Sequence, residues 1–132
     1  MARVYLDHNA SAVLRHEARD AMIAAMDVVG NPSSVHAEGR AAKAVLERAR
    51  AEVATAFGAD GADIVFTSGA TEAASLALAG RGLHGADVEH DAVVAWITPD
   101  AAVDAQGRVI IADPAQACLQ AANSETGILQ DL

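Results

Sequence analysis

The feature that most constrains the fold is the succession of segments between residues 63 and 79. Asp63 to Thr67 reads Asp-Ile-Val-Phe-Thr, a short apolar run typical of a buried strand. Ser68-Gly69-Ala70 follows as a turn of small residues, and the spacing predicts a helix from Thr71 to Ala79. Strand, small-residue turn and helix in this order form the pattern of α/β proteins. The predicted fold class is therefore α/β.

Two amphipathic helices are expected before this segment. Residues 14–28 carry apolar side chains at helical spacing, and Gly30 ends them. The second helix is expected to start at Ser33 or Ser34, whose hydroxyl can cap it, and to end at Gly58. Its apolar face recurs every four residues, with Val45, Ala49 and Val53. The first 60 residues are thus predicted to form a helical segment.

The remainder of the chain carries weaker signals. Residues 93–97 fit a strand or a helix, residues 109–112 a strand, and residues 116–122 neither clearly. Gly80 to Gly85 has the spacing of a dinucleotide-binding fingerprint, but a helix precedes it and none follows, so we interpret it as a loop. Residues 1–132 are expected to form one domain, with the α/β part over residues 61–132.

Composition excludes several classes of function. The net charge is −9, which opposes binding to nucleic acid. No signal peptide is recognisable at the start, and the longest apolar run, Ala92 to Ile97, is far too short to span a membrane. Cys118 is the one cysteine, so an internal disulfide is excluded and a reducing compartment is favoured. We therefore expect a cytoplasmic protein.

The turn from Thr67 to Glu72 is the best candidate site. A helix N-terminus offers unpaired N–H groups and partial positive charge, which suit a phosphate, and Gly69 allows close approach. An ordinary capping turn has the same composition and is the commoner case. His90 is either an acid/base or ring-stacking residue or a partly buried structural histidine. Cys118, among Ala, Gln and Leu, is expected to be a small buried hydrophobe.

Taken together, five segments in fixed order resemble the cysteine desulfurases of the class V aminotransferase family, pyridoxal-phosphate (PLP) enzymes of fold type I. They are Leu6 to Ala12 (LDHNASA), Gly30 to His36 (GNPSSVH) with Gly39-Arg40, Ile64 to Glu72 (IVFTSGATE), Glu89-His90, and Ala122 to Gly127 (ANSETG). The resemblance implies a portion of the fold type I large domain, with helices and an incomplete, mainly parallel sheet.

The resemblance also implies roles for individual residues. Ala70 and Thr71 would bind the PLP phosphate through a backbone N–H and a hydroxyl. His90 would stack on the pyridine ring and assist proton transfer, and Asn123 or Ser124 would lie near the cofactor's O3′. In this family the substrate is L-cysteine, the sulfur serves iron–sulfur cluster biogenesis, and the loop from Asn31 to His36 lies close to a dimer interface.

Residues that the resemblance requires are absent. Lys43 is the one lysine, and it lies on the charged face of the second helix, well before the phosphate turn, so no aldimine lysine is available. Cys118 precedes Asn123 and by order is not the catalytic cysteine. Little room remains between Gly80 and Glu89 for the strand that delivers the Glu-His pair. We expect a truncated desulfurase-like protein, inactive alone.

Three alternatives stay open. In the first, the chain is half of a split desulfurase, completed by a second polypeptide or assembled as a homodimer. In the second, the chain is a degenerate, non-catalytic paralogue or interaction protein. A third, remote alternative is an unrelated α/β phosphate-binding module.

Overall fold

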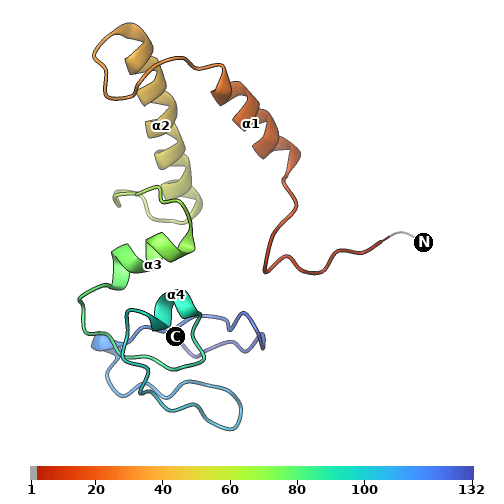
Figure 1. Ribbon diagram of the computed structural model, residues 1–132, viewed down its shortest axis with the longest axis vertical. Helices are drawn as coiled ribbons and strands as arrows, with labels where there is room; N and C mark the ends of the chain where they lie inside the picture. Colours follow the sequence, from red (N-terminus) through yellow and green to blue (C-terminus); the bar gives the residue numbers. More distant parts are fainter. Residues whose placement is uncertain (1–2) are drawn as a thin grey trace. The chain divides into compact units, whose positions relative to one another are not determined.

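The computed structural model describes residues 3–132 (Figure 1). They fall into two compact units, Met1–Phe66 and Thr67–Leu132, which are called the first and second unit below.

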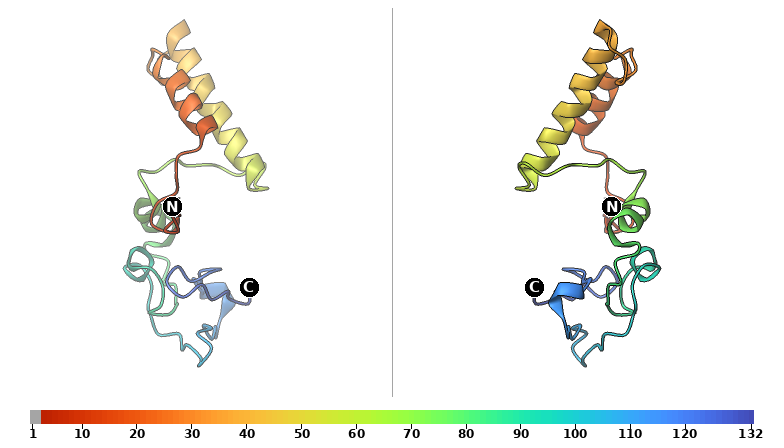
Figure 2. Two further views of the ribbon diagram at one scale, coloured as in Figure 1. Left: turned by 90° about the vertical axis from the view of Figure 1, so that its right-hand side faces the viewer. Right: turned by 90° about the vertical axis from the view of Figure 1, so that its left-hand side faces the viewer.

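The first unit contains the two predicted helices. Helix α1 spans His16–Met26, inside the expected range of residues 14–28, and has no buried residue. Helix α2 spans Ala37–Ala56, and its buried residues are Gly39 and Ala54. Figure 1 shows these two helices apart, joined by the loop over residues 27–36, and Figure 2 shows the same pair from two further sides. The sequence prediction of these helices is confirmed.

The predicted cap of α2 is wrong. The N-cap is His36, whose Nδ1 accepts a hydrogen bond from the Gly39 N–H at 3.4 Å. The same nitrogen lies 2.9 Å from Glu38 Oε2, a contact that requires it to carry a proton, so the two contacts compete. The two serines lie in a turn before the helix. Asn31 organises this turn, because its Oδ1 accepts from Ser33 N at 2.9 Å and its carbonyl accepts from Ser34 N.

Two glycines allow this turn to lie against α2. A Cβ at Gly39 would lie 2.5 Å from the Ser34 carbonyl oxygen and 2.8 Å from that of Asn31. At Gly30, where φ is +148°, it would lie 2.4 Å from the Glu38 carbonyl oxygen. Both distances are below any tolerable contact, so the close approach depends on the missing side chains.

Residues 63–67 do not form the predicted buried strand. They are extended but lack a ladder, and Val65 and Phe66 are exposed. A strand needs a hydrogen-bonded neighbour, and no other segment of the described chain pairs with these residues. These residues are mainly apolar, but apolar side chains alone do not determine whether a segment hydrogen-bonds to a neighbouring strand.

The second unit contains α3 (Ala70–Leu78), α4 (Asp91–Val94) and the short 3₁₀ helix η1 (Pro114–Gln116). Helix α3 agrees with the predicted helix over residues 71–79 to within one residue. Helices α3 and α4 pack against each other. The ambiguous segment 93–97 contributes the end of α4 and the turn that follows it, in which Trp96 N donates to Val93 O at 2.9 Å.

A small parallel arrangement lies at the centre of the second unit. His84 forms parallel bridges to both Thr98 and Ala117. Its N–H donates to Gln116 O at 2.8 Å, and its carbonyl accepts from Cys118 N at 2.8 Å. Residues 80–89 form no strand beyond these bridges at His84, in agreement with the expectation that little room remains there for one.

The other bridges are antiparallel. Val103 pairs with Val109, which reduces the predicted strand over residues 109–112 to one bridge, and Ala122 pairs with Leu129. The segment from Gly80 to Gly85 is a loop leading into the parallel bridges, as expected.

The apolar core is small. Among the described residues, the buried apolar side chains are Ala54 in the first unit and Ala86 in the second. Large apolar side chains such as Phe57, Val35 and Leu6 are more than 80% exposed. No helix in residues 3–132 has the length and apolarity needed to cross a membrane.

Candidate functional site

The N-terminus of α3 is open. Its N-cap is Gly69, which makes no side-chain cap hydrogen bond. A Cβ built at Gly69 would meet no atom within 4 Å, so the space above the first turn is clear. Ala70 is the first residue of the helix, and Thr71 follows it with its side chain exposed. The first-turn N–H groups and the Thr71 hydroxyl are thus placed to donate to one anion.

The Glu72 side chain binds the backbone on the N-terminal side of this turn. Its Oε2 accepts a hydrogen bond from Ser68 N at 2.6 Å, and the Thr67 hydroxyl donates to Gly69 O at 3.0 Å. The hydrogen bonds from Ser68 hold the pKa of the Glu72 carboxyl below its usual value. The carboxylate therefore holds the backbone at Ser68, just before the helix, and this hydrogen bond fixes the shape of the turn.

His90 caps α4. Its backbone is extended, with φ −65° and ψ 145°, and its Nδ1 accepts a hydrogen bond from the Ala92 N–H at 3.1 Å. The ring is exposed. Because α3 and α4 pack together, the helix that opens at Ala70 and the helix that His90 caps belong to one packed pair.

Asn123 is buried, and its side chain is committed to the protein. Its Nδ2 donates to Val88 O at 3.0 Å. Its Oδ1 accepts from Glu125 N at 2.9 Å and from Thr126 N at 2.8 Å. These two bonds use both lone pairs of the amide oxygen. The Asn123 side chain therefore links its own loop to the segment before His90, and these three hydrogen bonds are called the bracket of Asn123 below. Ser124, its neighbour, is exposed.

Glu89 is the buried acid of the second unit. The residue is 8% exposed, and its carboxylate accepts from Gln120 N at 2.8 Å, while Gln120 Nε2 donates to Val88 O at 3.0 Å. Burial raises the pKa of Glu89, and the hydrogen bond from Gln120 opposes that rise. Burial also raises the pKa of the Cys118 thiol, and the charge of Glu89 raises it further. Cys118 is thus a suppressed thiol rather than a nucleophile.

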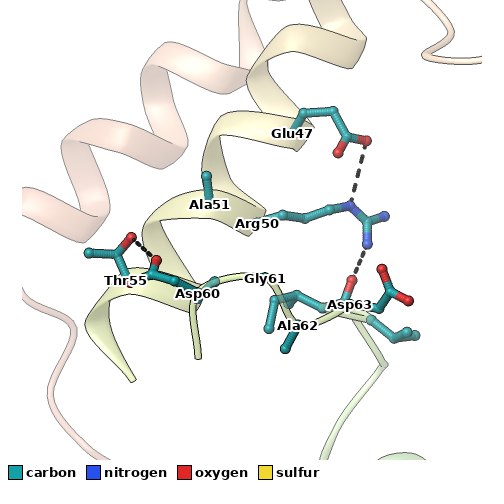
Figure 3. Close-up of a pocket in the computed structure, with 11 residues that line it drawn as sticks. Glu47, Arg50, Ala51, Thr55, Asp60, Gly61, Ala62 and Asp63 are labelled. Atoms are coloured by element: carbon teal, nitrogen blue, oxygen red, sulfur yellow. Dashed lines mark hydrogen bonds and ion pairs between the residues drawn. The ribbon is translucent and has the colours of Figure 1, made fainter. Parts of the chain in front are cut away.

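Both units contain hollows among their described residues. In the first unit a hollow of about 660 Å³ lies between the end of α2 and residues 60–65 (Figure 3). Arg50 crosses it, donating through Nη1 to Ile64 O, with its Nε 3.6 Å from Glu47 Oε1 and its guanidinium 5.2 Å from the Phe66 ring centroid. The second hollow, of about 510 Å³, is lined by His84, Asp100 and mainly apolar residues from 101 to 117.

The structure brings the expected site residues into one unit. Ala70, Thr71, His90, Asn123 and Ser124 all lie in the second unit, and Asn123 is tied to the residues directly before His90. Reasoning from the sequence missed Glu89 and Gln120 as supports of this segment. The Glu-His pair was a signal for Glu89, whereas nothing in the local sequence marks Gln120.

The chain is similar to known proteins of one family. The family described as Aminotransferase class-V matches residues 4–103. A cysteine desulfurase from Frankia sp. (strain EuIK1) is 37% identical and aligns with 97% of this chain and 39% of its own length. A selenocysteine lyase from Bos taurus is 42% identical over 58% of this chain and 18% of its own length. The X-ray structure of a NifS-like protein from Rickettsia africae ESF-5 superposes with a TM-score of 0.81 at 30% identity, covering 96% of this chain and 42% of that one.

This chain is shorter than the Frankia relative inside the region where the two align. The alignment with the Frankia protein runs over 164 positions, more than the 132 residues of this chain. The relative therefore carries residues inside the aligned region that have no counterpart here. The chain spans about two fifths of the length of this relative and of the rickettsial structure.

The superposition bears out the predicted fold, a portion of a fold type I protein. The expected mainly parallel sheet is not formed, because the described residues contain isolated bridges instead of strands, two of them parallel and two antiparallel. Because the family matches about three quarters of the residues, the relationship does not depend on one motif. The chain belongs to the aminotransferase class-V family, with cysteine desulfurases among its relatives.

Proposed function

We propose that the second unit supplies the phosphate-binding turn and the ring-stacking histidine of a PLP-dependent cysteine desulfurase. The observation that carries this proposal is the uncapped N-terminus of α3, packed beside the helix that His90 caps. A phosphate dianion needs several N–H donors and a hydroxyl, and the turn at Ala70 and Thr71 provides them.

The residues present fit the cofactor's phosphate and ring. The clear space at Gly69 admits a phosphate, and the exposed ring of His90 is free to stack on a planar pyridine. The bracket formed by Asn123 holds the loop next to the His90 segment, so we assign Asn123 and Ser124 to the cofactor's O3′ side, with Asn123 acting mainly through its loop. Bound PLP supplies an electron sink for chemistry at the substrate's Cα.

The same residues do not supply the cofactor-holding lysine. Lys43 is the one lysine of the sequence, and it lies on α2 in the first unit, exposed to solvent. Cys118 is suppressed by burial. We therefore propose that these 132 residues alone do not desulfurise L-cysteine. Activity in this family context would require a second polypeptide or further residues that bring a lysine and a reactive cysteine.

Binding of the phosphate is tested with pyridoxamine 5′-phosphate, which has no aldehyde and so cannot react with Lys43. Unphosphorylated pyridoxamine is the matched control. Fluorescence of Trp96, the one tryptophan, reports on the second unit. We expect the phosphorylated compound to bind at least about 10-fold more tightly, because hydrogen bonds to a charged group contribute about 1.5–3 kcal/mol each.

Two variants place the binding at the turn. Ala70→Pro removes one first-turn N–H at a position where proline suits a helix, and Thr71→Val removes the hydroxyl. Both should weaken binding of the phosphorylated compound and leave binding of pyridoxamine unchanged. Equal affinity for the two compounds would sink the proposal. For catalysis, we expect no cysteine-dependent sulfide release from the purified chain with PLP, and measurable release would contradict that part.

The proposed substrate class rests on the amino acids for which the relatives are named. Cysteine and selenocysteine differ in one chalcogen atom, and relatives named for each are similar to this chain. We propose L-cysteine, since the relative that aligns with 97% of the chain is a cysteine desulfurase. A homodimer, or a complex with a complementing polypeptide, is proposed on the exposure of the large apolar side chains.

A further inference from the structure

Two histidines of the second unit make opposite contacts through the same ring atom. His90 Nδ1 faces the Ala92 N–H at 3.1 Å. His84 Nδ1 faces the Asp100 carboxylate, at 2.9 Å from each of its oxygens. A nitrogen that accepts an N–H must carry a lone pair, whereas a nitrogen against a carboxylate must carry a proton.

Neutral imidazole has a single N–H, so each contact decides where that proton lies. In His90 the lone pair is on Nδ1 and the proton is on Nε2. In His84 the proton is on Nδ1 and Nε2 keeps its lone pair. The two rings are therefore expected in opposite tautomers, although both are exposed and belong to the same unit.

We propose that the Ala92 amide fixes His90 as a hydrogen-bond donor through Nε2, so that Ala92 is a positioning residue for the ring-stacking histidine. The inference rests on the proposed function for its relevance, because it specifies which atom His90 presents there. With Nδ1 engaged, neutral His90 offers a proton and no lone pair. Its fitting partner is an acceptor, such as a carboxylate or carbonyl oxygen of an amino-acid substrate.

The backbone around His90 supports this assignment. Val94 N and Val93 N both donate to His90 O, at 3.0 and 2.7 Å, so the first turn of α4 is closed on the residue that caps it. On the other side, Val88 O is held by Asn123 and Gln120. Rotation of the ring away from Ala92 would leave a first-turn N–H without its partner, which costs free energy.

The test reads the tautomers directly in the full chain without any cofactor. Histidine is labelled with ¹⁵N, and long-range proton–nitrogen correlations are recorded near pH 8.5, about two units above the ordinary pKa of the imidazole. His90→Asn and His84→Asn identify the signals. We expect a pyridine-type Nδ1 and a pyrrole-type Nε2 for His90, with the reverse for His84. Averaged shifts or an Nδ1 proton at His90 would overturn the proposal.

Two proline variants assign the cause. Ala92→Pro removes the amide proton that His90 accepts, and Asp91→Pro places the same residue one position earlier while leaving that proton in place. Loss of the fixed pattern at His90 in Ala92→Pro, with retention in Asp91→Pro, supports the proposal. An unchanged pattern in Ala92→Pro contradicts it, and so does loss in both variants.

The His84 pattern serves as the internal control of folding in each sample. Because the measurement needs no cofactor, failure to bind pyridoxamine 5′-phosphate would refute the proposed function and leave the tautomer assignment intact. Binding of pyridoxamine 5′-phosphate without the expected tautomer pattern at His90 would refute only the tautomer assignment.

Discussion

The side-chain nitrogen of Asn123 lies 3.0 Å from the carbonyl oxygen of Val88, 35 residues earlier in the chain. This contact joins the loop at residues 122–127 to the segment that carries Glu89 and His90. Two motifs that are far apart in sequence therefore share one hydrogen-bond network, in which Gln120 binds both Val88 and Glu89.

Asn123→Ala should destabilise the second unit by about 1–3 kcal/mol, because a buried side chain loses three hydrogen bonds and leaves Val88 O with fewer donors. The measurement is urea unfolding followed by Trp96 fluorescence. Glu125→Ala is the matched control, since it changes an exposed side chain in the same loop and keeps the backbone N–H. Equal effects of the two variants would show that the bracket has no special weight.

Glu89 should make the stability of the second unit depend on pH. Burial raises its pKa in the folded state, so its contribution is fully present below the ordinary value of 4.5 and is lost as the pH rises through the folded pKa. Unfolding free energy should fall over that range in the wild-type chain, and the fall should be smaller in Glu89→Gln. Urea midpoints at a series of pH values measure the difference.

Glu72 provides a contrast of sign in the same unit. Its pKa is lowered, so its contribution is present above the ordinary value and is lost as the pH falls through the lowered pKa. Subtracting the Glu89→Gln profile from the wild-type profile isolates Glu89. We expect wild type minus Glu89→Gln to become more negative as the pH rises through the folded pKa of Glu89, and a difference that becomes more positive with rising pH would contradict the assignment.

Arg50→Met should loosen residues 63–66 and cost about 1–2 kcal/mol, because the segment loses the donor to Ile64 O and the guanidinium beside Phe66. Hydrogen exchange of the amides from Asp60 to Phe66 measures the loosening. Arg48→Met, an exposed arginine on the same helix, is the control. Equal exchange rates in the two variants would count against a clamp by Arg50.

Gly39→Ala should reduce the stability of the first unit, although alanine is favoured over glycine in a helix by about 1 kcal/mol. The new Cβ would lie 2.5 Å from Ser34 O and 2.7 Å from Ser34 Cβ. The turn at Asn31 would have to move away from α2. Circular dichroism during heating measures the change, and Ala41→Gly, two residues further along the same helix, gives the ordinary propensity effect for comparison. A more stable Gly39→Ala chain would refute the close packing.

Helices could be predicted from the sequence because their periodic apolar faces are local properties. The spacing of Val45, Ala49 and Val53 located α2, and the small-residue turn before Thr71 located α3. Both histidine caps were missed, since histidine is not among the residues that usually cap helices. His36 and His90 act as caps because the preceding turns place an imidazole nitrogen over the first-turn amides.

Contacts between distant segments were beyond such reasoning. Residues 63–67 have the composition of a strand, but pairing requires a neighbour that the local sequence does not specify. Conversely, the sequence around His84 does not predict a strand, yet His84 forms parallel bridges to two other segments. Site residues were identified by motif resemblance, whereas the burial of Glu89 and the bracket of Asn123 emerged only from the arrangement of the second unit.

Within residues 3–132 the buried apolar side chains, Ala54 and Ala86, are both alanines, and this has a thermal consequence. The heat capacity of unfolding grows with the apolar surface that unfolding exposes. A chain that hides so few methyl groups has little such surface to release. Its stability curve against temperature should therefore be shallow, with a broad melting transition and little tendency to unfold in the cold, until an associating surface covers Phe57, Val35 and Leu6 and steepens the curve.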